Sequence, residues 1–144
     1  MAALLKTIIS SSAEGTKAGN IGVLVLRVFV GLAMAFAHGM GKFPIPDQLI
    51  EGISAMGFPM PTAFAHAAAF SEAVGGLLLA LGLFTRPAAA FVAFTMLVAG
   101  FVVHAADPFH IKELAFLYLA IGVFFLLHGA GRYSLDFVLQ KKLK

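Results

Sequence analysis

The sequence of 144 residues contains no cysteine. This absence excludes disulfides, thiolate metal ligands and cysteine-bound iron-sulfur clusters. It also excludes the paired-thiol chemistry by which some four-helix membrane enzymes make or reduce disulfides. Any redox function of the chain therefore depends on groups other than thiols.

Charge is scarce as well. Only 12% of the residues are charged, 60% are hydrophobic, and the mean hydropathy is +0.96. Soluble domains have roughly a quarter charged residues. A domain this small cannot bury so much apolar surface in its own interior, whereas a lipid bilayer accepts that surface. The composition therefore predicts an integral membrane protein.

The positive net charge does not indicate a nucleic-acid partner. The net charge is +3 and the isoelectric point is about 9.5, but the Lys and Arg residues lie between hydrophobic segments. No aromatic-rich basic patch accompanies them, as nucleic-acid binding would require. The expected partners are membrane lipid and either other redox subunits or a second copy of the chain.

Four hydrophobic segments predict the fold class. They cover residues 21–39, 63–84, 87–104 and 113–131. Each approaches the roughly 20 residues that a helix needs to cross the hydrocarbon core. We therefore expect an all-α, integral membrane four-helix antiparallel bundle over residues 21–138. A tail of residues 1–20 precedes it, and a basic tail of residues 139–144 follows.

The connections between the segments carry helix signals of their own. Thr85 is predicted to cap the third helix, because Pro87 fits its first turn. Within the long connection from residue 40 to 61, apolar residues recur at helical spacing over residues 48–56. This pattern predicts a short amphipathic helix at the membrane interface, in the first extracytoplasmic loop, where it could act as a lid. Ser134 is predicted to cap a short C-terminal helix.

The distribution of Lys and Arg predicts the orientation. Positive residues are retained on the cytoplasmic side. With four spans, eight of the ten share one side, and Lys42 and Lys112 lie on the other. The eight are Lys6, Lys17, Arg27, Arg86, Arg132, Lys141, Lys142 and Lys144. Both termini are therefore predicted to be cytoplasmic.

Ionisable residues within the spans are the candidate functional residues, because such residues are costly in lipid and usually face the bundle interior. Arg27, His38 and Lys42 share one stripe of the first helix with Gly31 and Met34.

Glu72 lies near the middle of the second span, with Ala65, Ala69, Gly75 and Gly76 near its face. It is either a structural acid, protonated or ion-paired, or an acid that carries protons or binds a ligand. Arg27 is the obvious partner, but side chains lean toward the N-terminus of their helix, so the two lean apart. The pair would then be loose or water-bridged, and Arg27 could instead snorkel to the headgroups.

An antiparallel bundle brings most of the histidines to one depth. His38, His66 and His104 gather with Lys42 and Glu113 at the non-cytoplasmic end, with Asp107 and His110 in the loop above. Such a layer could shuttle protons, hydrogen-bond the carbonyls of a quinone or ligate a metal. Ordinary interfacial histidines are the alternative. No spacing resembles a metal signature, so no metal site is predicted.

The chain resembles the DoxX family of small four-helix bacterial membrane proteins. The resemblance covers roughly residues 22–138. It rests on Leu26-Arg27, His38-Gly39, Gly41-Lys42-Phe43, Met56-Gly57-Phe58-Pro59, Glu72 with Gly75-Gly76, Gly82-Leu83-Phe84-Thr85-Arg86 and Tyr133-Ser134-Leu135-Asp136.

The resemblance implies a protein of the bacterial cytoplasmic (inner) membrane and an oxidoreductase. Family members act as a quinone-linked subunit of thiosulfate oxidation or join membrane complexes that handle thiol and oxidative stress. By similarity, the family's positions correspond to Arg27, His38, Lys42, Glu72 and Arg86.

Three functions remain open at this point. The first is a subunit of a quinone-reducing complex, with Glu72, His38 and His66 as catalytic residues and Arg27, Lys42, His104 and Glu113 as cofactor-binding residues. The cofactor would be a quinone, with no intrinsic metal or iron-sulfur cluster. The second is a non-catalytic membrane scaffold for soluble redox or stress enzymes. The third is a transporter of protons or small molecules.

Overall fold

The computed structural model describes residues 8–9 and 15–143. In this part of the chain all regular structure is helical. Four helical segments are long and apolar enough to cross a membrane, and they span Lys17–Lys42, Pro61–Leu81, Thr85–Val103 and Phe109–His128. The predicted all-α fold with four membrane-spanning helices is therefore confirmed.

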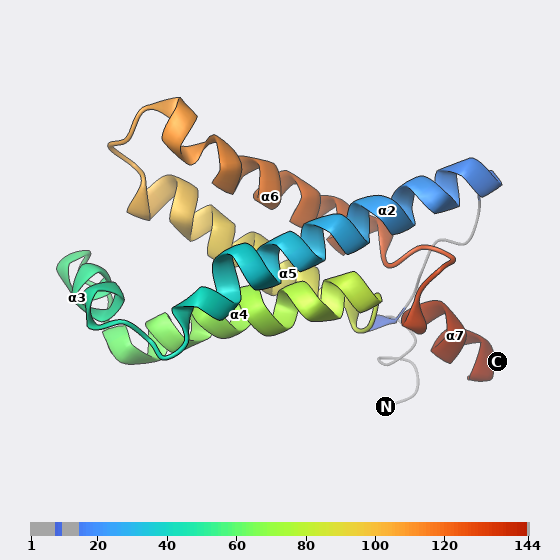
Figure 1. Cartoon of the computed structure of the whole chain (residues 1–144), viewed down its shortest axis with the longest axis horizontal. Coiled ribbons are helices and arrows are strands. Elements are labelled where there is room, and N and C mark those ends of the chain that lie inside the picture. Colours follow the sequence, from blue (N-terminus) through green and yellow to red (C-terminus); the bar gives the residue numbers. More distant parts are fainter. Residues whose placement is uncertain (1–7, 10–14, 144) are drawn as a thin grey trace.

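Each spanning segment runs antiparallel to the next (Figure 1). The first consists of α2 (Lys17–Ala33), the π-helical turn η1 (Met34–Gly39) and the 3₁₀ turn η2 (Met40–Lys42). The others are α4 (Pro61–Leu81), α5 (Thr85–Val98) with the π-helical turn η3 (Ala99–Val103), and α6 (Phe109–His128). The α4 helix packs against both α2 and α5, and α5 packs against α6.

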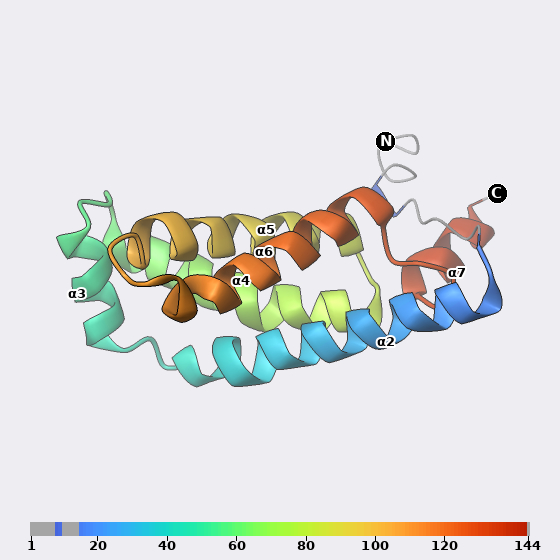
Figure 2. The same ribbon diagram turned by 90° about the horizontal axis from the view of Figure 1, so that it is seen from above.

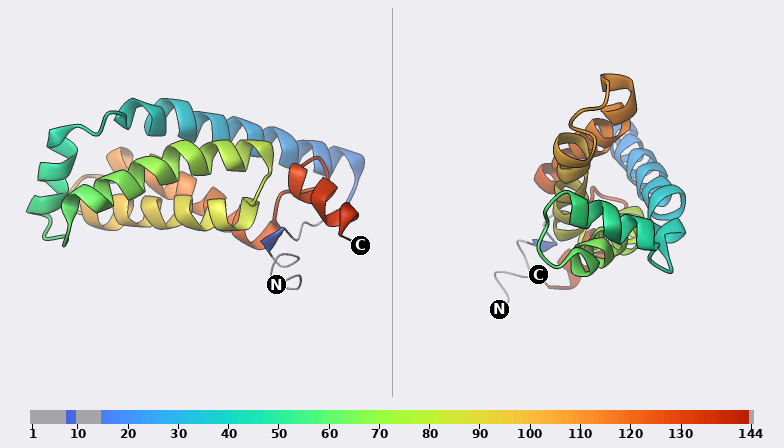
Figure 3. Two further views of the ribbon diagram at one scale, coloured as in Figure 1. Left: turned by 90° about the horizontal axis from the view of Figure 1, so that it is seen from below. Right: turned by 90° about the vertical axis from the view of Figure 1, so that its left-hand side faces the viewer.

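Two short helices lie at opposite ends of the bundle (Figure 2). The α3 helix (Asp47–Ala55) crosses one end, and α7 (Leu135–Lys142) lies at the other, the end at which α2 begins. We call these the α3 end and the α7 end. The amphipathic helix predicted in the first long connection is confirmed as α3, which buries Ile53 and lies across the helix ends (Figure 3).

Small residues bring α2 and η1 into backbone contact with α4. A Cβ atom on Gly31 would lie 2.6 Å from the Gly76 carbonyl oxygen, and one on Gly76 would lie 2.8 Å from the Ala35 nitrogen. A Cβ atom on Gly39 would overlap the backbone of Ala73. Without side chains at these points, the two helices approach as closely as small residues allow in membrane bundles.

The spans begin earlier than the hydrophobic segments do. The α2 helix begins at Lys17, so the predicted boundary of the N-terminal tail at residue 20 falls inside it. Thr16 caps this helix by accepting a hydrogen bond from the Gly19 nitrogen at 3.1 Å. The fourth span begins at Phe109, four residues before the predicted start. Its first turns carry Lys112 and Glu113, and hydropathy alone places such charged residues outside a span. Residues 1–7, 10–14 and 144 of the predicted tails lie outside the described residues.

Asp136, and not Thr85, caps α5. Its carboxylate accepts hydrogen bonds from the backbone nitrogens of Phe84 at 2.8 Å and Thr85 at 2.9 Å. The predicted cap through the Thr85 hydroxyl is wrong, since that hydroxyl is buried without a hydrogen-bond partner among the described residues. The second predicted cap is confirmed, because the Ser134 hydroxyl accepts a hydrogen bond from the Phe137 nitrogen at 3.2 Å.

Candidate functional site

The polar stripe of the first span faces the bundle interior. Arg27, Gly31 and Met34 are buried, and His38 and Lys42 are half-buried. His38 lies in η1, where π-helical turns widen the helix. Such turns are frequent at functional sites of other proteins. The spacing argument therefore placed the stripe correctly over both α2 and its irregular end.

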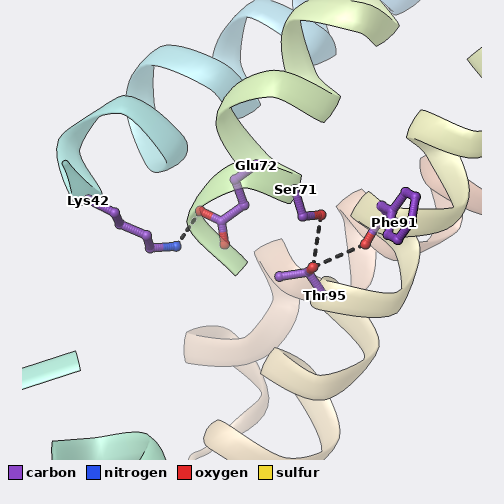
Figure 4. Close-up of polar contacts among 5 residues, drawn as sticks. All are labelled: Lys42, Ser71, Glu72, Phe91 and Thr95. Carbon is purple, nitrogen blue, oxygen red and sulfur yellow. Dashed lines mark hydrogen bonds and ion pairs between the residues drawn. The ribbon is translucent and has the colours of Figure 1, made fainter. Parts of the chain in front are cut away.

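Lys42 and Glu72 form an ion pair inside the α3 end of the bundle (Figure 4). The Glu72 side chain is 4% exposed, whereas that of Lys42 is 29% exposed. Lys42 comes from η2, the last turn of the first span, and Glu72 comes from the middle of α4. The pair therefore joins a buried carboxylate to a cation that reaches the bundle end.

The close approach of η1 to α4 makes this pairing accessible. Gly39 lies against the backbone of Glu72 and Ala73, where any Cβ atom would overlap. Because Lys42 follows Gly39 by three residues, its side chain starts close to Glu72. The Glu72 carboxylate leans toward the α3 end, as side chains lean toward the N-terminus of their own helix.

Arg27 does not pair with Glu72. Its Nη1 donates hydrogen bonds to the carbonyl oxygens of Leu79 at 2.8 Å and Ala80 at 2.6 Å, and its Nη2 donates to the Tyr133 carbonyl at 2.8 Å. The guanidinium thus bonds two carbonyls in the last turn of α4, one of which, that of Leu79, also accepts from the Gly82 nitrogen at 3.1 Å. The residue is 1% exposed, so it does not snorkel to the headgroups either.

The basic side chains at the two ends of the bundle have different partners: arginines at the α7 end bind backbone carbonyls, and Lys42 at the α3 end binds a carboxylate. At the α7 end, Arg86 Nη1 also donates to a carbonyl, that of Leu126 at 2.6 Å. Gly82, with φ of +66°, leaves space that the Arg27 guanidinium occupies. These contacts tie helix ends together, whereas Lys42 at the α3 end neutralises an acid.

His38 contacts Tyr118 of α6 edge to face. The ring centroids are 5.5 Å apart, with an angle of 78° between the ring planes. Tyr118 is buried in the middle of α6, within the apolar stretch that follows Glu113. In the described part of the chain, no hydrogen bond reaches the His38 ring nitrogens or the Tyr118 hydroxyl. Two side chains inside the bundle therefore retain donors and acceptors for a ligand.

A second polar contact links α4 to α5 beside Glu72. The Thr95 hydroxyl lies 2.9 Å from the Ser71 hydroxyl and 3.0 Å from the Phe91 carbonyl oxygen (Figure 4). Ser71 also lines an apolar groove of about 380 Å³ between α4 and α5, with Phe70, Phe84 and Phe91. This groove lies on a different face of α4 from the ion pair, because neighbouring helical residues point about 100° apart.

The remaining residues of the predicted layer lie near the surface. His66 is exposed, and its Nδ1 lies 2.8 Å from the Thr62 carbonyl oxygen. His104 Nδ1 lies 2.7 Å from Asp107 Oδ2 in the loop. Glu113 and His110 are exposed as well. Thus the structure brings Lys42 to Glu72 and His38 to Tyr118, but it records no contact of the other three predicted residues with Glu72.

The described residues contain no group of three or more His, Cys, Asp or Glu side chains that could hold a metal ion. Tyr118 was not predicted as a site residue. It could have been noticed in the sequence, because it is one of only two tyrosines and lies in the centre of a hydrophobic segment. Asp136 was likewise not predicted as a helix cap, because that cap joins positions 51 and 52 residues apart.

Comparisons with known proteins agree on one family. The sequence model of the DoxX family matches residues 22–105, more than half of the chain. A Haemophilus influenzae protein whose name assigns no function is 37% identical over 125 residues, which cover 81% of this chain and 90% of the relative. The Bacillus subtilis protein named "Putative oxidoreductase CatD" is 33% identical over a match that covers 88% of this chain and 93% of that protein. The Escherichia coli inner membrane protein YqjF is 32% identical over a match that covers 88% of this chain and 98% of that protein. No solved structure matches the chain.

Proposed function

The chain belongs to the DoxX family of membrane proteins, and we propose that it is the membrane subunit of a quinone-linked oxidoreductase. The observation that carries the proposal is the unused hydrogen-bonding capacity of His38 and Tyr118 inside the bundle. His38 lies one helical turn from Lys42, whose partner Glu72 is a buried acid. The name of one relative, which contains the word oxidoreductase, supports the redox class.

The residues fit a quinone in their chemistry. A bound quinone supplies a ring that accepts two electrons and two protons and presents two carbonyl oxygens as hydrogen-bond acceptors. A His38 ring N–H and the Tyr118 hydroxyl are donors for such oxygens. The electrons would come from a partner redox subunit, because the chain has no cysteine to provide them.

The ion pair supplies the proton chemistry of the proposal. The Glu72 carboxylate is buried, and Lys42 supplies the opposite charge that a buried carboxylate needs. Since Lys42 is partly exposed at the α3 end, the pair connects the bundle interior to that membrane surface.

Binding of a short-chain, water-soluble quinone tests this proposal directly. We expect saturable binding to the purified protein in nanodiscs by equilibrium dialysis, weakened about tenfold by His38→Ala and by Tyr118→Phe. His66→Ala is the matched control, because His66 is exposed. Equal binding by wild type and both site variants would contradict the proposal.

The orientation belongs to the same proposal. The start of α2 and all of α7 lie at one end of the bundle (Figure 2). Arg86 lies in the first turn of α5 and Arg132 lies shortly before α7, at the same end, and Arg27 reaches that end through its hydrogen bond to the Tyr133 carbonyl. Lys42 and Lys112 lie toward the other end. By the retention of positive residues on the cytoplasmic side, the α7 end would be cytoplasmic in a bacterial inner membrane.

A scaffold for soluble redox or stress enzymes is the second candidate. It is favoured by the exposed cations Arg132, Lys141 and Lys142, which share the α7 end. The replacement of Lys141 and Lys142 by Gln would weaken recovery of a docked acidic partner while leaving quinone binding unchanged. Normal recovery of that partner would count against the scaffold.

A further inference from the structure

We propose that a polar cavity at the α7 end binds the phosphate group of an anionic phospholipid. The cavity has a volume of about 330 Å³ and is lined by Gly15, Lys17, Asn20, Arg132 and Tyr133. It lies between the start of α2 and the segment that leads from α6 to α7. It shares no residue with the Lys42–Glu72 pair, so this proposal stands or falls independently of the proposed function.

The charges around the cavity favour an anion. Lys17 and Arg132 both line it, and both are exposed. No acidic residue is among its described lining residues. Asp136, four residues beyond Arg132, is buried, and its carboxylate accepts hydrogen bonds from Phe84 and Thr85 instead. A phosphate oxygen would relieve the repulsion between the two cations and would accept charge-assisted hydrogen bonds from both.

The walls of the cavity are held in place before any ligand binds. The Tyr133 carbonyl accepts a hydrogen bond from the buried Arg27 guanidinium at 2.8 Å. Asn20 is buried, and its Nδ2 donates to the Thr16 carbonyl at 3.0 Å. A preformed site loses less conformational freedom on binding than a mobile surface does. This anchoring distinguishes the cavity from ordinary exposed lysines.

The position of the cavity selects a lipid as the source of the phosphate. Two membrane-spanning segments terminate beside it, since the first begins at Lys17 and the last ends at His128. Lipid headgroups lie at this depth, just outside the hydrocarbon core. The neighbouring α7 helix exposes the apolar side chains of Leu135, Val138 and Leu139, and Leu143 directly after the helix is exposed as well. Such apolar side chains beside lysines are typical of helices that lie in the headgroup region.

Lipid binding to wild type and variants tests the proposal. We expect native mass spectrometry of the detergent-solubilised full chain to show retention of phosphatidylglycerol in preference to phosphatidylcholine. The preference should fall about tenfold or more in the Lys17→Gln/Arg132→Gln variant, because the phosphate loses a charge-assisted hydrogen bond to each of the two side chains. Both side chains are exposed, so the variant should fold. The control is Lys141→Gln/Lys142→Gln, which removes the same charge from α7 and should lower the preference far less, because neither side chain lines the cavity.

Two outcomes would overturn the proposal. If both double variants lose the preference equally, the lipid responds to the total charge of the α7 end and not to the cavity. If inorganic phosphate raises the thermal unfolding midpoint as much as phosphatidylglycerol does, and through the same two residues, the cavity takes free phosphate and the lipid assignment is wrong.

Discussion

Glu72 forms its ion pair with Lys42 and not with Arg27, although all three residues lie in the same interior of the bundle. Arg27 and Glu72 lie on antiparallel helices, so their side chains lean in opposite directions. Arg27 therefore reaches the carbonyls at the α7 end, and Glu72 reaches the cation at the α3 end. This division separates a contact that holds helix ends together from one that neutralises a buried acid.

We expect the Lys42–Glu72 ion pair to contribute measurably to stability. Lys42→Met leaves a buried carboxylate without its partner and should destabilise the protein by about 1–3 kcal/mol. Glu72→Gln in the Lys42→Met background should recover part of that loss, because it removes the unpaired acid. Far-UV circular dichroism during thermal unfolding in detergent measures both. Strictly additive effects of the two substitutions would show that the side chains do not interact.

The glycine contact between η1 and α4 should tolerate no methyl group. Gly39→Ala places a Cβ atom in the backbone of Ala73 and should cost about 1–3 kcal/mol or more, because the helices must separate. Gly22→Ala is the matched control, since a Cβ atom there meets nothing within 4 Å. The control should leave the unfolding midpoint unchanged or raise it, because Ala favours helix. A similar loss in both variants would contradict the close packing described here.

Arg27 should be sensitive even to a conservative change. Arg27→Lys keeps the charge, but its single nitrogen cannot reach three carbonyl oxygens on two segments of the chain. We expect a loss of about 2 kcal/mol or more, since hydrogen bonds from charged groups are strong. Thermal unfolding of Arg27→Lys beside the exposed Lys141→Arg provides the comparison. Wild-type stability of Arg27→Lys would mean that a single charge suffices.

The orientation can be measured directly because the natural chain has no cysteine. Arg132→Cys and Lys112→Cys each introduce one thiol, at the α7 end and the α3 end respectively. In intact spheroplasts, a membrane-impermeant maleimide should label Lys112→Cys and leave Arg132→Cys unlabelled. Lysis should expose both thiols to the reagent. The reverse labelling would place the α7 end outside the cell.

Periodicity and composition were sufficient to predict the fold class. Four segments of nearly sufficient length predicted four spans, and the period of the apolar residues predicted α3, because both signals are local. The stripe of Arg27, His38 and Lys42 also followed from helical geometry alone. The starts of α2 and α6 could not be predicted in this way. Thr16 caps α2 ahead of its hydrophobic segment, and the first turns of α6 contain charged residues.

The partners of the polar residues depended on tertiary contacts. Which residue neutralises Glu72 follows from the approach at Gly39, and the cap of α5 comes from Asp136, more than fifty residues away. Neither relationship has a period or a spacing that a sequence displays. The common depth expected for the histidines likewise did not distinguish His38, which contacts Tyr118 inside the bundle, from His66 on its surface.

The most direct test of the proposed site is mass spectrometry of the organic extract from mildly purified protein. The wild-type protein should retain a substantial molar ratio of quinone to protein. The variants Glu72→Gln, His38→Ala and Tyr118→Phe should each retain much less. The control His66→Ala should retain as much as wild type. Quinone in none of the samples, or in all of them at the level expected from carried-over lipid, would contradict a quinone site between His38, Tyr118 and the Lys42–Glu72 pair.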